Sequence, residues 1–579
     1  MNSLLSLDAI VIGVFLSITF GLSIFFRKRN STLREYFQSE GKLSWFIAGT
    51  GMVATTFAAD TPLAVTELVA GSGISGNWVW WSMSIGSIIT TYFFAPLWKR
   101  SGALTDIELI NFRYSGKASE LLRMMKSVYF GFFVNILVMS WVNLAILKIL
   151  RTLLPDFHPE ILVIVLFLFS FFYTAVVGLT GISYLDTFQF FFAMLGCVIL
   201  AFYAVWLPEI GGIAGLLEKL PSKTFDLIPD FSSEKPGETG IWSFLVLLCV
   251  VWWSSWYPGA EPGGGGYIAQ RIMATKDVRS SVYSSLYFTI AHYFIRPWPW
   301  IIVALASVVL YPKLLPAESG SGFILVMQRA LPKGLFGFLV AGFIAAYLST
   351  IATHLNWGAS YLINDFYKPY VRRNESDAHY IRFAMFLQFV FVAFALLITF
   401  YGIQTVSGVW IFLIECASGI GFVLMARWYW WRINVFSEIG AFVFSMIFYV
   451  IGKFVLSLQF PFSVAFTSFS TVACVLVISF LTPETEKSVL KNFYKTVRPP
   501  GFFWKNWAVA NNVVLNKGGV SMLRLVVLSV AGVGIIFSGL SGIGFLIFGK
   551  IFHFAAALSL LCVSLFVTVK FFPKDEESL

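Results

Sequence analysis

The sequence predicts an all-α polytopic membrane protein with about 15 transmembrane helices, ten of which form two inverted repeats of five helices. Three observations support this prediction. The 579 residues are 58% hydrophobic and 12% charged, with a mean hydropathy of +0.80, whereas a soluble chain carries roughly 25% charged residues. Apolar runs of about 20 residues recur from one end of the chain to the other. Two of these runs are interrupted in the middle by residues that break a membrane helix.

The apolar runs account for almost the whole chain. The longest stretch between them, residues 482–522, is too short to form a soluble domain of its own. The predicted helices begin near Leu7, Trp45, Trp78, Ser127, Ile161, Tyr184, Trp242, Val282, Leu335, Phe383, Val406, Ile439, Val464, Leu525 and Phe545.

The basic residues indicate how the chain crosses the membrane. If the N-terminus lies outside, most of the 40 Lys and Arg residues fall on one side, as expected for the cytoplasmic side. The net charge of +10 therefore reflects orientation rather than a nucleic-acid partner, and a plasma-membrane protein is predicted. The main clusters lie at residues 27–29, 99–100, 271–279, 372–373, 427–432 and 487–524.

The two interrupted runs contain the candidate transport site. The first holds Asp60 and Pro62 in the middle of residues 45–70, and the second holds Pro258, Glu261 and the glycines of residues 263–266. Such residues free backbone groups at bilayer depth, where only protein, water or a ligand can satisfy them. Broken helices in corresponding halves of a chain are typical of the central site of a carrier.

If each broken helix opens a repeat, each repeat holds an odd number of crossings, and the second repeat is inverted relative to the first. The predicted organisation is an additional N-terminal helix and inner loop (1–42), the first repeat (43–207), an outer loop (208–239), the second repeat (240–430) and additional C-terminal helices (431–579).

Five short segments form a recognisable pattern when taken together. They are Arg34-Glu35-Tyr36-Phe37 with Gly41, Ala58-Ala59-Asp60-Thr61, Asp186-Thr187-Phe188-Gln189, Tyr267-Ile268-Ala269-Gln270-Arg271, and Ala346-Tyr347-Leu348-Ser349-Thr350 followed by Ile363-Asn364-Asp365-Phe366-Tyr367. In this order they resemble the sodium:solute symporter family, which includes bacterial proline, sialate and galactose symporters and animal sodium–glucose carriers. The resemblance covers about residues 5–485 and implies LeuT-type inverted repeats.

The resemblance also implies a sodium site between the first break and the eighth core helix. Sodium prefers oxygen ligands, and positions 346, 349 and 350 share one helix face. The alternative is that the two hydroxyls only bond back to their own helix. The implied ligands are the carbonyl groups of Ala58, Thr61 and Ala346 and the hydroxyl groups of Ser349 and Thr350.

Two aspartates are candidates for gating. By the resemblance, Asp60 stands where proline symporters have an aspartate and sugar carriers an asparagine. We expect Asp60 to tune sodium binding or gate closure, the alternative being a hydrogen-bonding brace. Asp186 lies near an inner helix end and is expected to support inner gating, or a proton or second-cation site, unless its role is structural.

The remaining candidates for substrate binding or gating are Glu67, Tyr257, Glu261, His292 and Arg296. By the resemblance, His292 stands about where galactose-type carriers have a basic residue that contacts the substrate. Arg296 follows one turn later and is expected either to pair with Glu261 or Glu67 or to bind a substrate carboxylate. The glycines beside Glu261 favour close approach of a ligand to the backbone, although a flexible hinge fits them as well.

The predicted function is a sodium-coupled secondary active symporter that imports a small organic solute by alternating access. Its cargo is sodium together with an amino acid, a sugar or a small carboxylate. The alternatives are a sodium-independent or proton-coupled carrier and a transporter-like sensor or channel. An enzyme is not predicted, because the sequence contains no nucleophile with partners, no metal cluster and no nucleotide loop.

Overall fold

The computed structural model describes residues 6–26, 32–153, 158–231, 240–403, 406–515 and 520–573, and helices dominate it. Within these ranges, ten helices are long and apolar enough to cross a membrane, and three further apolar helices span 10–17 residues. The described β-structure consists of two isolated bridges, Leu43–Thr275 and Ser255–Ser418. The all-α membrane fold is therefore confirmed, whereas the count of about 15 crossings stays a prediction. The basic cluster at residues 27–29 lies outside the described residues.

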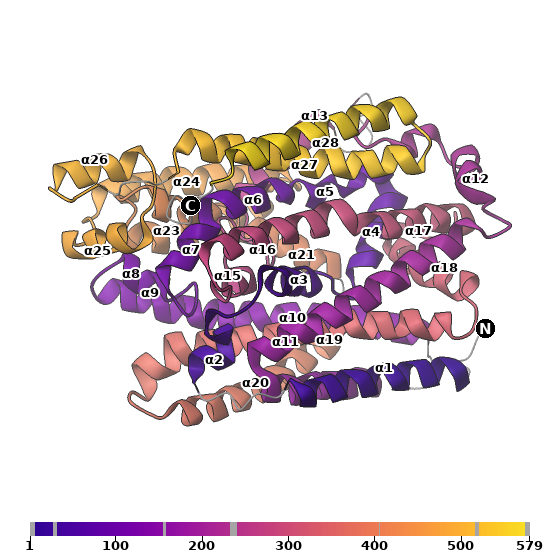
Figure 1. Ribbon diagram of the computed structural model, residues 1–579, viewed down its shortest axis with the longest axis horizontal. Coiled ribbons are helices and arrows are strands. Elements are labelled where there is room, and N and C mark those ends of the chain that lie inside the picture. The colour runs from indigo at the N-terminus through magenta and orange to yellow at the C-terminus, as the bar shows by residue number, and fades with distance from the viewer. Residues whose placement is uncertain are drawn as a thin grey trace.

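The first part of the chain contains one isolated helix and the elements of the predicted first repeat. α1 packs against α11 and α19 at one edge of the bundle (Figure 1). α11 corresponds to the two helices predicted to begin near Ile161 and Tyr184. Its backbone departs from helical geometry at Gly178 (φ 61°), which divides it into two segments. The helices are α1 (Ser6–Phe25), α2 (Leu33–Gln38), α3 (Trp45–Thr55), α4 (Thr61–Ser72), α5 (Trp78–Trp81), α6 (Met83–Ile89), α7 (Ala95–Ser101), α8 (Leu109–Arg113), α9 (Lys117–Val128), α10 (Asn135–Leu153), α11 (Pro159–Val205) and α12 (Gly212–Lys219).

The second part supplies the core partner of α11. α19, which carries the predicted sodium-binding hydroxyls, is buried along almost its whole length and packs against α11, α10 and α3. The helices are α13 (Ile241–Val246), α14 (Trp252–Ser254), α15 (Gly266–Met273), α16 (Val278–Ile290), α17 (Pro297–Leu310), α18 (Gly322–Ala330), α19 (Leu335–Tyr361), α20 (Asp377–Tyr401), α21 (Val406–Cys416) and α22 (Ile420–Tyr429).

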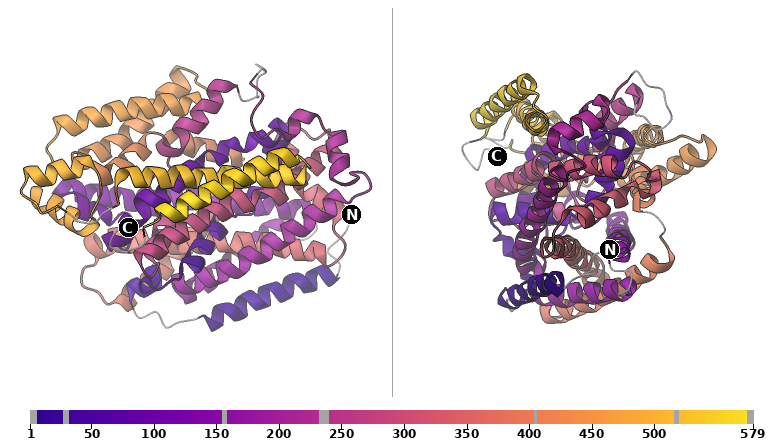
Figure 2. Two further views of the ribbon diagram at one scale, coloured as in Figure 1. Left: turned by 45° about the horizontal axis from the view of Figure 1, so that its top comes forward. Right: turned by 90° about the vertical axis from the view of Figure 1, so that its right-hand side faces the viewer.

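The C-terminal helices cover the outside of this core. α27 and α28 form a hairpin at the edge of the bundle opposite α1, shown in yellow (Figure 2), and α27 contacts α6 and α16. The helices are α23 (Val435–Val450), α24 (Phe462–Leu481), α25 (Lys487–Val497), α26 (Phe502–Ala510), α27 (Met522–Ile547) and α28 (Ile551–Phe571).

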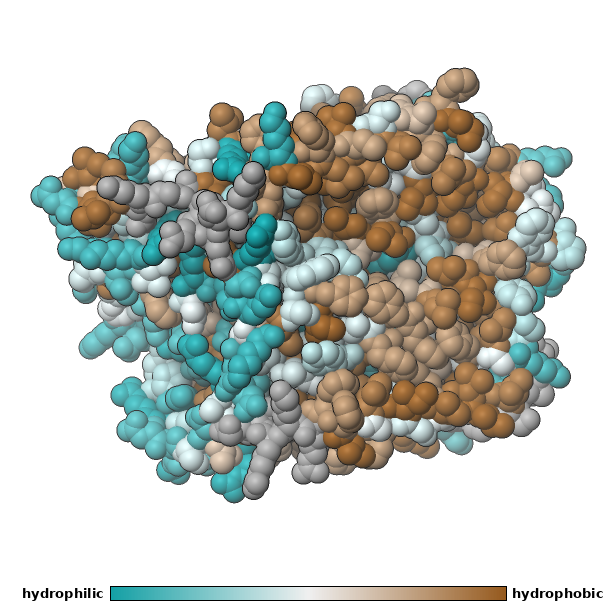
Figure 3. All heavy atoms as spheres, in the orientation of Figure 1, coloured by the Kyte–Doolittle hydropathy of each residue, from teal (hydrophilic) through white to brown (hydrophobic). Residues whose placement is uncertain are grey.

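Polar residues mark the ends of the bundle. Hydrophilic side chains gather at the end that holds α8, α25 and α26, and a broad apolar surface adjoins it (Figure 3). α7, which ends in Lys99 and Arg100, points to this end, whereas the N-terminus lies at the other (Figure 1). The arrangement agrees with a basic side opposite the N-terminus. Which side faces the cytoplasm stays a prediction.

A third helix interruption, which the sequence analysis did not predict, lies between α21 and α22. Gly419 adopts φ +93° and donates its backbone N–H to the carbonyl of Ser254, 2.8 Å away. The N–H of Trp256 in turn donates to Ala417 O at 3.4 Å. The third interruption and the second break, which begins after Ser254, therefore satisfy backbone groups of each other, as buried backbone in a membrane requires.

We expect Gly419→Ala to destabilise the protein by about 2–4 kcal/mol for two reasons. The backbone at this position is left-handed, which costs energy for alanine, and the added Cβ overlaps a neighbouring side chain. The added atom would lie 2.6 Å from Cβ of Thr471. The melting temperature of the purified protein measures the loss. Gly13→Ala is the control, since no atom lies within 4 Å of the corresponding position. Equal melting temperatures for the two variants would contradict the packing argument.

Candidate functional site

The first helix break separates α3 from α4 inside the bundle. α3 ends at Thr55 and α4 begins at Thr61, so residues 56–60 leave the helical path. Pro62 lies in the first turn of α4, where its missing N–H costs no helical hydrogen bond. The position of the break agrees with the sequence prediction.

The second break is longer and runs through residues 255–265, between α14 and α15. Gly259, Gly263 and Gly264 have φ angles of 87°, 75° and 77°, which side chains rarely adopt. A Cβ on Gly259 would lie 2.3 Å from the hydroxyl oxygen of Tyr267. The indole of Trp98 donates to the carbonyl of Gly263 at 2.8 Å. In this structure the glycines therefore allow close packing of the break, and the hinge stays an alternative.

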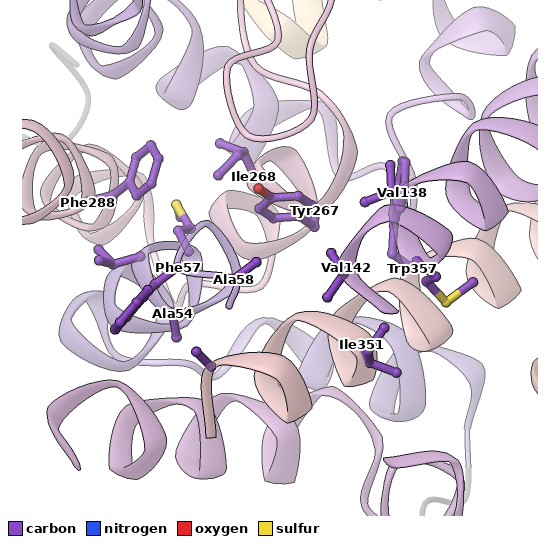
Figure 4. Close-up of a cluster of buried hydrophobic side chains, with 14 of the residues drawn as sticks. Ala54, Phe57, Ala58, Val138, Val142, Tyr267, Ile268, Phe288, Ile351 and Trp357 are labelled. Carbon is purple, nitrogen blue, oxygen red and sulfur yellow. The ribbon is translucent and has the colours of Figure 1, made fainter. Parts of the chain in front are cut away.

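A cavity of about 120 Å³ lies between the two breaks. Figure 4 shows Ala58 of the first break, Tyr267 of α15 and Val142 of α10 around this region. The cavity also extends along α4 past Ala64 and Leu68. Seven of the residues singled out from the sequence line it, namely Ala58, Asp60, Thr61, Tyr257, His292, Arg296 and Thr350.

The hydroxyl groups of α19 link it to the first break. Thr350 Oγ1 lies 3.0 Å from the carbonyl oxygen of Thr55 and 3.1 Å from that of Ala346. Thr350 therefore bonds both to its own helix, which was the alternative to a sodium site, and to the end of α3 at the first break. Ser349 lies beside it but donates its hydroxyl to Asp186 Oδ1 at 2.6 Å.

Asp186 is almost completely buried and belongs to a polar chain next to these hydroxyls. Its Oδ2 lies 2.5 Å from the guanidinium of Arg271, which also donates to Thr353 at 2.8 Å. Thr353 lies 3.0 Å, hydroxyl to hydroxyl, from Thr55. This chain of contacts joins α11, α15, α19 and α3, and Asp186 lies inside the bundle rather than at its surface.

Arg296 does not form the expected ion pair with Glu261 or Glu67 among the described residues; its described partners are two backbone carbonyls, one hydroxyl and, at 3.4 Å, the Nε2 atom of His292. Its guanidinium donates to the carbonyls of Val53 and Thr56 and to the Thr56 hydroxyl, each at 3.1 Å. These carbonyls lie where α3 unwinds and loses its helical donors. The arginine therefore caps the C-terminal end of α3.

His292 lies in a π-helical turn, Ala291–Ile295, that joins α16 to α17. Its Nδ1 is 2.9 Å from Thr56 Oγ1, and its ring meets Trp80 edge-on with centroids 5.7 Å apart. Turns of this kind often occur at functional sites. His292 and Arg296 thus reach the first break together from one helical segment.

The three acids considered for the cavity occupy different environments. Asp60 lines the cavity, is only 4% exposed, and its Oδ1 has no hydrogen-bond partner among the described residues. Glu67 is exposed and does not contribute to the cavity wall. Glu261 is buried but does not line the cavity, although the preceding residues Pro258, Gly259 and Ala260 do. Only one of these acids is therefore placed to meet a solute.

Three aromatic side chains, those of Trp141, Tyr257 and Trp410, form a wall of the cavity, and only Tyr257 was predicted from the sequence. Trp141 of α10 and Tyr257 of the second break are nearly parallel, with an interplanar angle of 12° and centroids 6.3 Å apart. Trp410 of α21 stands edge-on to both rings. His354, one turn after Thr350, also lines the cavity. Trp141, Trp410 and His354 lie in uninterrupted apolar runs, so no local signal distinguishes them from ordinary core, whereas Tyr257 lies in the second break and was predicted as a candidate.

Comparison with known proteins gives one family. The model of the sodium:solute symporter family matches residues 36–447. A sodium/glucose cotransporter from Vibrio parahaemolyticus is 25% identical over 399 residues, covering 64% of this chain and 70% of that protein. Sodium/glucose cotransporter 2 from Rattus norvegicus is 23% identical, and the match spans 62% of this chain and 58% of the rat protein.

Sialic acid carriers are similar both in sequence and in fold. A sodium/sialic acid symporter from Proteus mirabilis is 22% identical over 370 residues, covering 60% of this chain and 68% of that protein. The solved structure of a Na⁺-coupled sialic acid symporter in a substrate-bound outward-open state superposes with a TM-score of 0.70 at 20% identity. It covers 83% of this chain and 98% of that one, so the two chains share a fold.

Proposed function

Because this chain belongs to the sodium:solute symporter family, we propose that it is a sodium-coupled secondary active symporter that imports a small organic solute by alternating access. The observation that carries the proposal is the cavity between two broken helices, with hydroxyl groups of α19 beside the first break. Sodium and solute drive the cycle by binding one arrangement of the helices better than another. Family membership makes the chain a transporter rather than an enzyme.

The proposed sodium site lies between the first break and α19. Its oxygen ligands are the carbonyls of Ala58, Thr61 and Ala346 and the hydroxyls of Ser349 and Thr350. Two features support it: Ala58, Thr61 and Thr350 line the same cavity, and Thr350 Oγ1 lies 3.0 Å from the Thr55 carbonyl. Oxygen atoms of unwound backbone and helix hydroxyls suit a hard monovalent cation. Asp60, in the same break, is proposed to tune sodium binding or closure of the gate.

The solute is proposed to bind against the aromatic wall, with Asp60 as its polar contact. An ammonium group or a hydroxyl group donates naturally to a carboxylate oxygen that lacks another donor. The flat faces of Trp141 and Tyr257 suit a ring or a cationic group. The terminal nitrogens of Arg296 already bind carbonyls, which makes a solute carboxylate a weaker candidate for that side chain. Amino acids and sugars are therefore the first solutes to test, followed by small carboxylates.

The membrane arrangement completes the proposal. We place the chain in the plasma membrane with the N-terminus outside and about 15 crossings. Several of these crossings are broken into pairs of shorter helices, such as α3 with α4, α14 with α15, and α21 with α22. LeuT-type inverted repeats over residues 43–207 and 240–430 put the two breaks in corresponding positions.

The test is the melting temperature of the purified protein with amino acids, sugars and small carboxylates, each in sodium and in potassium. A bound solute stabilises the folded protein by mass action, so a transported solute raises the melting temperature, and more in sodium. A solute shift of equal size in both salts would replace the proposal with a sodium-independent or proton-coupled carrier. Sodium flux through proteoliposomes in the absence of any solute would indicate a channel.

A further inference from the structure

Glu261 is a buried acid that the proposed transport site does not use. It is 4% exposed, and neither carboxylate oxygen has a hydrogen-bond partner among the described residues. The backbone N–H groups of Glu261 itself and of Gly259, within the unwound segment, also act on this carboxyl group. An ionised carboxylate in such a place is costly unless a cation or several donors compensate it.

A second acid, Asp106, approaches the same stretch of backbone. Asp106 Oδ2 accepts the N–H of Gly266 at 3.2 Å, and Tyr361 donates its hydroxyl to Oδ1. A Cβ on Gly266 would lie 2.6 Å from Glu261 Oε1, and one on Gly265 would lie 3.3 Å from Asp106 Oδ2. The two carboxyl groups therefore flank the first residues of α15.

A third polar group at this place has no described partner. The indole nitrogen of Trp357 is buried without an acceptor, and the ring lies 3.4 Å from the same Cβ position on Gly266. Unpaired buried polar atoms are rare and need an explanation. Here Glu261 Oε1 and the Trp357 ring both lie next to the Cβ position of one glycine, Gly266.

The nearby cations are used elsewhere. Neither Glu261 nor Asp106 takes part in an ion pair among the described residues. Lys126 and Arg427, the cations within electrostatic reach of Asp106, pair with Glu438 at 2.6 and 3.1 Å. The other ionisable groups that face Glu261 are the phenols of Tyr267, Tyr293 and Tyr361.

From this geometry we infer that Glu261, flanked by Asp106, is a proton-binding site in the second helix break, separate from the proposed sodium site. A proton needs only one oxygen, whereas sodium requires a shell of several. The groups that meet Glu261 at Gly266 are a tryptophan ring and glycine backbone, which favours the proton. Two carboxyl groups beside the same short stretch of backbone also favour protonation of one of them, because their negative charges repel each other.

The proton has a consequence for transport, and this step rests on the proposed function. α15 must move relative to Asp106 and Tyr361 if the inner path is to open beside it. Water then reaches Glu261, and an exposed glutamic acid ionises at neutral pH. Binding and release of the proton are in this way linked to the same movement that releases the solute.

Infrared spectra of the full-length protein in lipid nanodiscs at about pH 7, with the spectrum of each variant subtracted from that of the wild type, test the site without a solute. The wild type should show the carbonyl band of a protonated carboxylic acid that Glu261→Gln lacks. Glu160→Gln, which changes an exposed acid paired with Arg151, should keep the band. Identical spectra for wild type and Glu261→Gln would overturn the inference.

Asp106→Asn provides a second, independent readout. If Asp106 faces the proton site, this substitution should shift the position of the Glu261 band, and an unmoved band would exclude Asp106 from the site. Proteoliposomes with a trapped pH dye then measure proton entry driven by a sodium gradient and an active solute. Proton entry should be lost in Glu261→Gln and kept in Glu160→Gln. Absence of sodium-driven uptake in every variant would refute the proposed function, whereas the infrared result tests Glu261 alone.

Discussion

We expect that sodium will no longer raise the melting temperature when Ser349 and Thr350 are both replaced by alanine. This is the largest effect that we predict. The double variant removes two of the five proposed oxygen ligands. We expect sodium affinity to fall at least tenfold, or about 1.4 kcal/mol, and sodium-driven uptake to be lost. The measurement is the melting temperature against sodium concentration, with potassium to keep the ionic strength constant.

A matched control separates this effect from general damage to the fold. Ser17→Ala with Thr152→Ala makes the same chemical change at exposed positions, where each hydroxyl bonds only to its own helix. This control should keep the full sodium response. The double variant itself should lose about 1–3 kcal/mol of stability per hydrogen bond removed, because Asp186 and the Thr55 carbonyl are buried and each lose a donor. An unchanged sodium response in Ser349→Ala, Thr350→Ala would show that the proposed ligand set is wrong.

Arg296→Ala should both destabilise the protein and stop transport. Arg296 is 1% exposed and donates to two carbonyls and one hydroxyl at the end of α3. Its removal leaves those acceptors buried and unsatisfied, which costs about 2–5 kcal/mol. The break also loses the group that binds the Thr56 carbonyl and hydroxyl, directly after the Thr55 carbonyl that accepts from Thr350. We therefore expect a lower melting temperature and at least a tenfold decrease in uptake rate.

Two further variants test this explanation. Arg296→Lys keeps the charge but cannot reproduce the planar fork of donors, so its melting temperature should lie between those of wild type and Arg296→Ala. Arg329→Ala removes an arginine from the exposed ion pair with Glu209 and should leave both measurements unchanged. If Arg296→Lys behaves as the wild type does, charge alone is sufficient and the capping explanation fails.

Several features of the site could be predicted from the sequence because they depend on local chemistry. Proline in a membrane run predicts a break, and glycines that must adopt positive φ predict an unwound segment. The breaks at residues 56–60 and 255–265 follow these rules. The spacing of Ser349 and Thr350 on α19 likewise follows from helical geometry. Charge counting identified the polar ends of the bundle.

Other features could not be predicted because they depend on which distant groups meet. The presence of Arg296 indicates only that a buried guanidinium needs acceptors. These acceptors are the carbonyls of Val53 and Thr56 at the end of α3, which lie 243 and 240 positions away in the sequence. The packing of α16 and α17 against the break determines that they, and not Glu261, lie within reach. In the sequence, Gly419 cannot be distinguished from any other glycine in an apolar run. Its role becomes visible only in the fold, where it donates a hydrogen bond to Ser254 at the start of the second break.

The sequence by itself determined the membrane class, the family resemblance, the two principal breaks and the hydroxyl pair on α19, since each rests on residue type and short-range spacing. The tertiary structure alone decided that Asp60 faces the cavity while Glu67 and Glu261 do not, and that Trp141, Tyr257 and Trp410 form one wall. The physical reason is that a polar or aromatic residue in a membrane helix requires a partner, but only long-range packing determines which partner lies within reach.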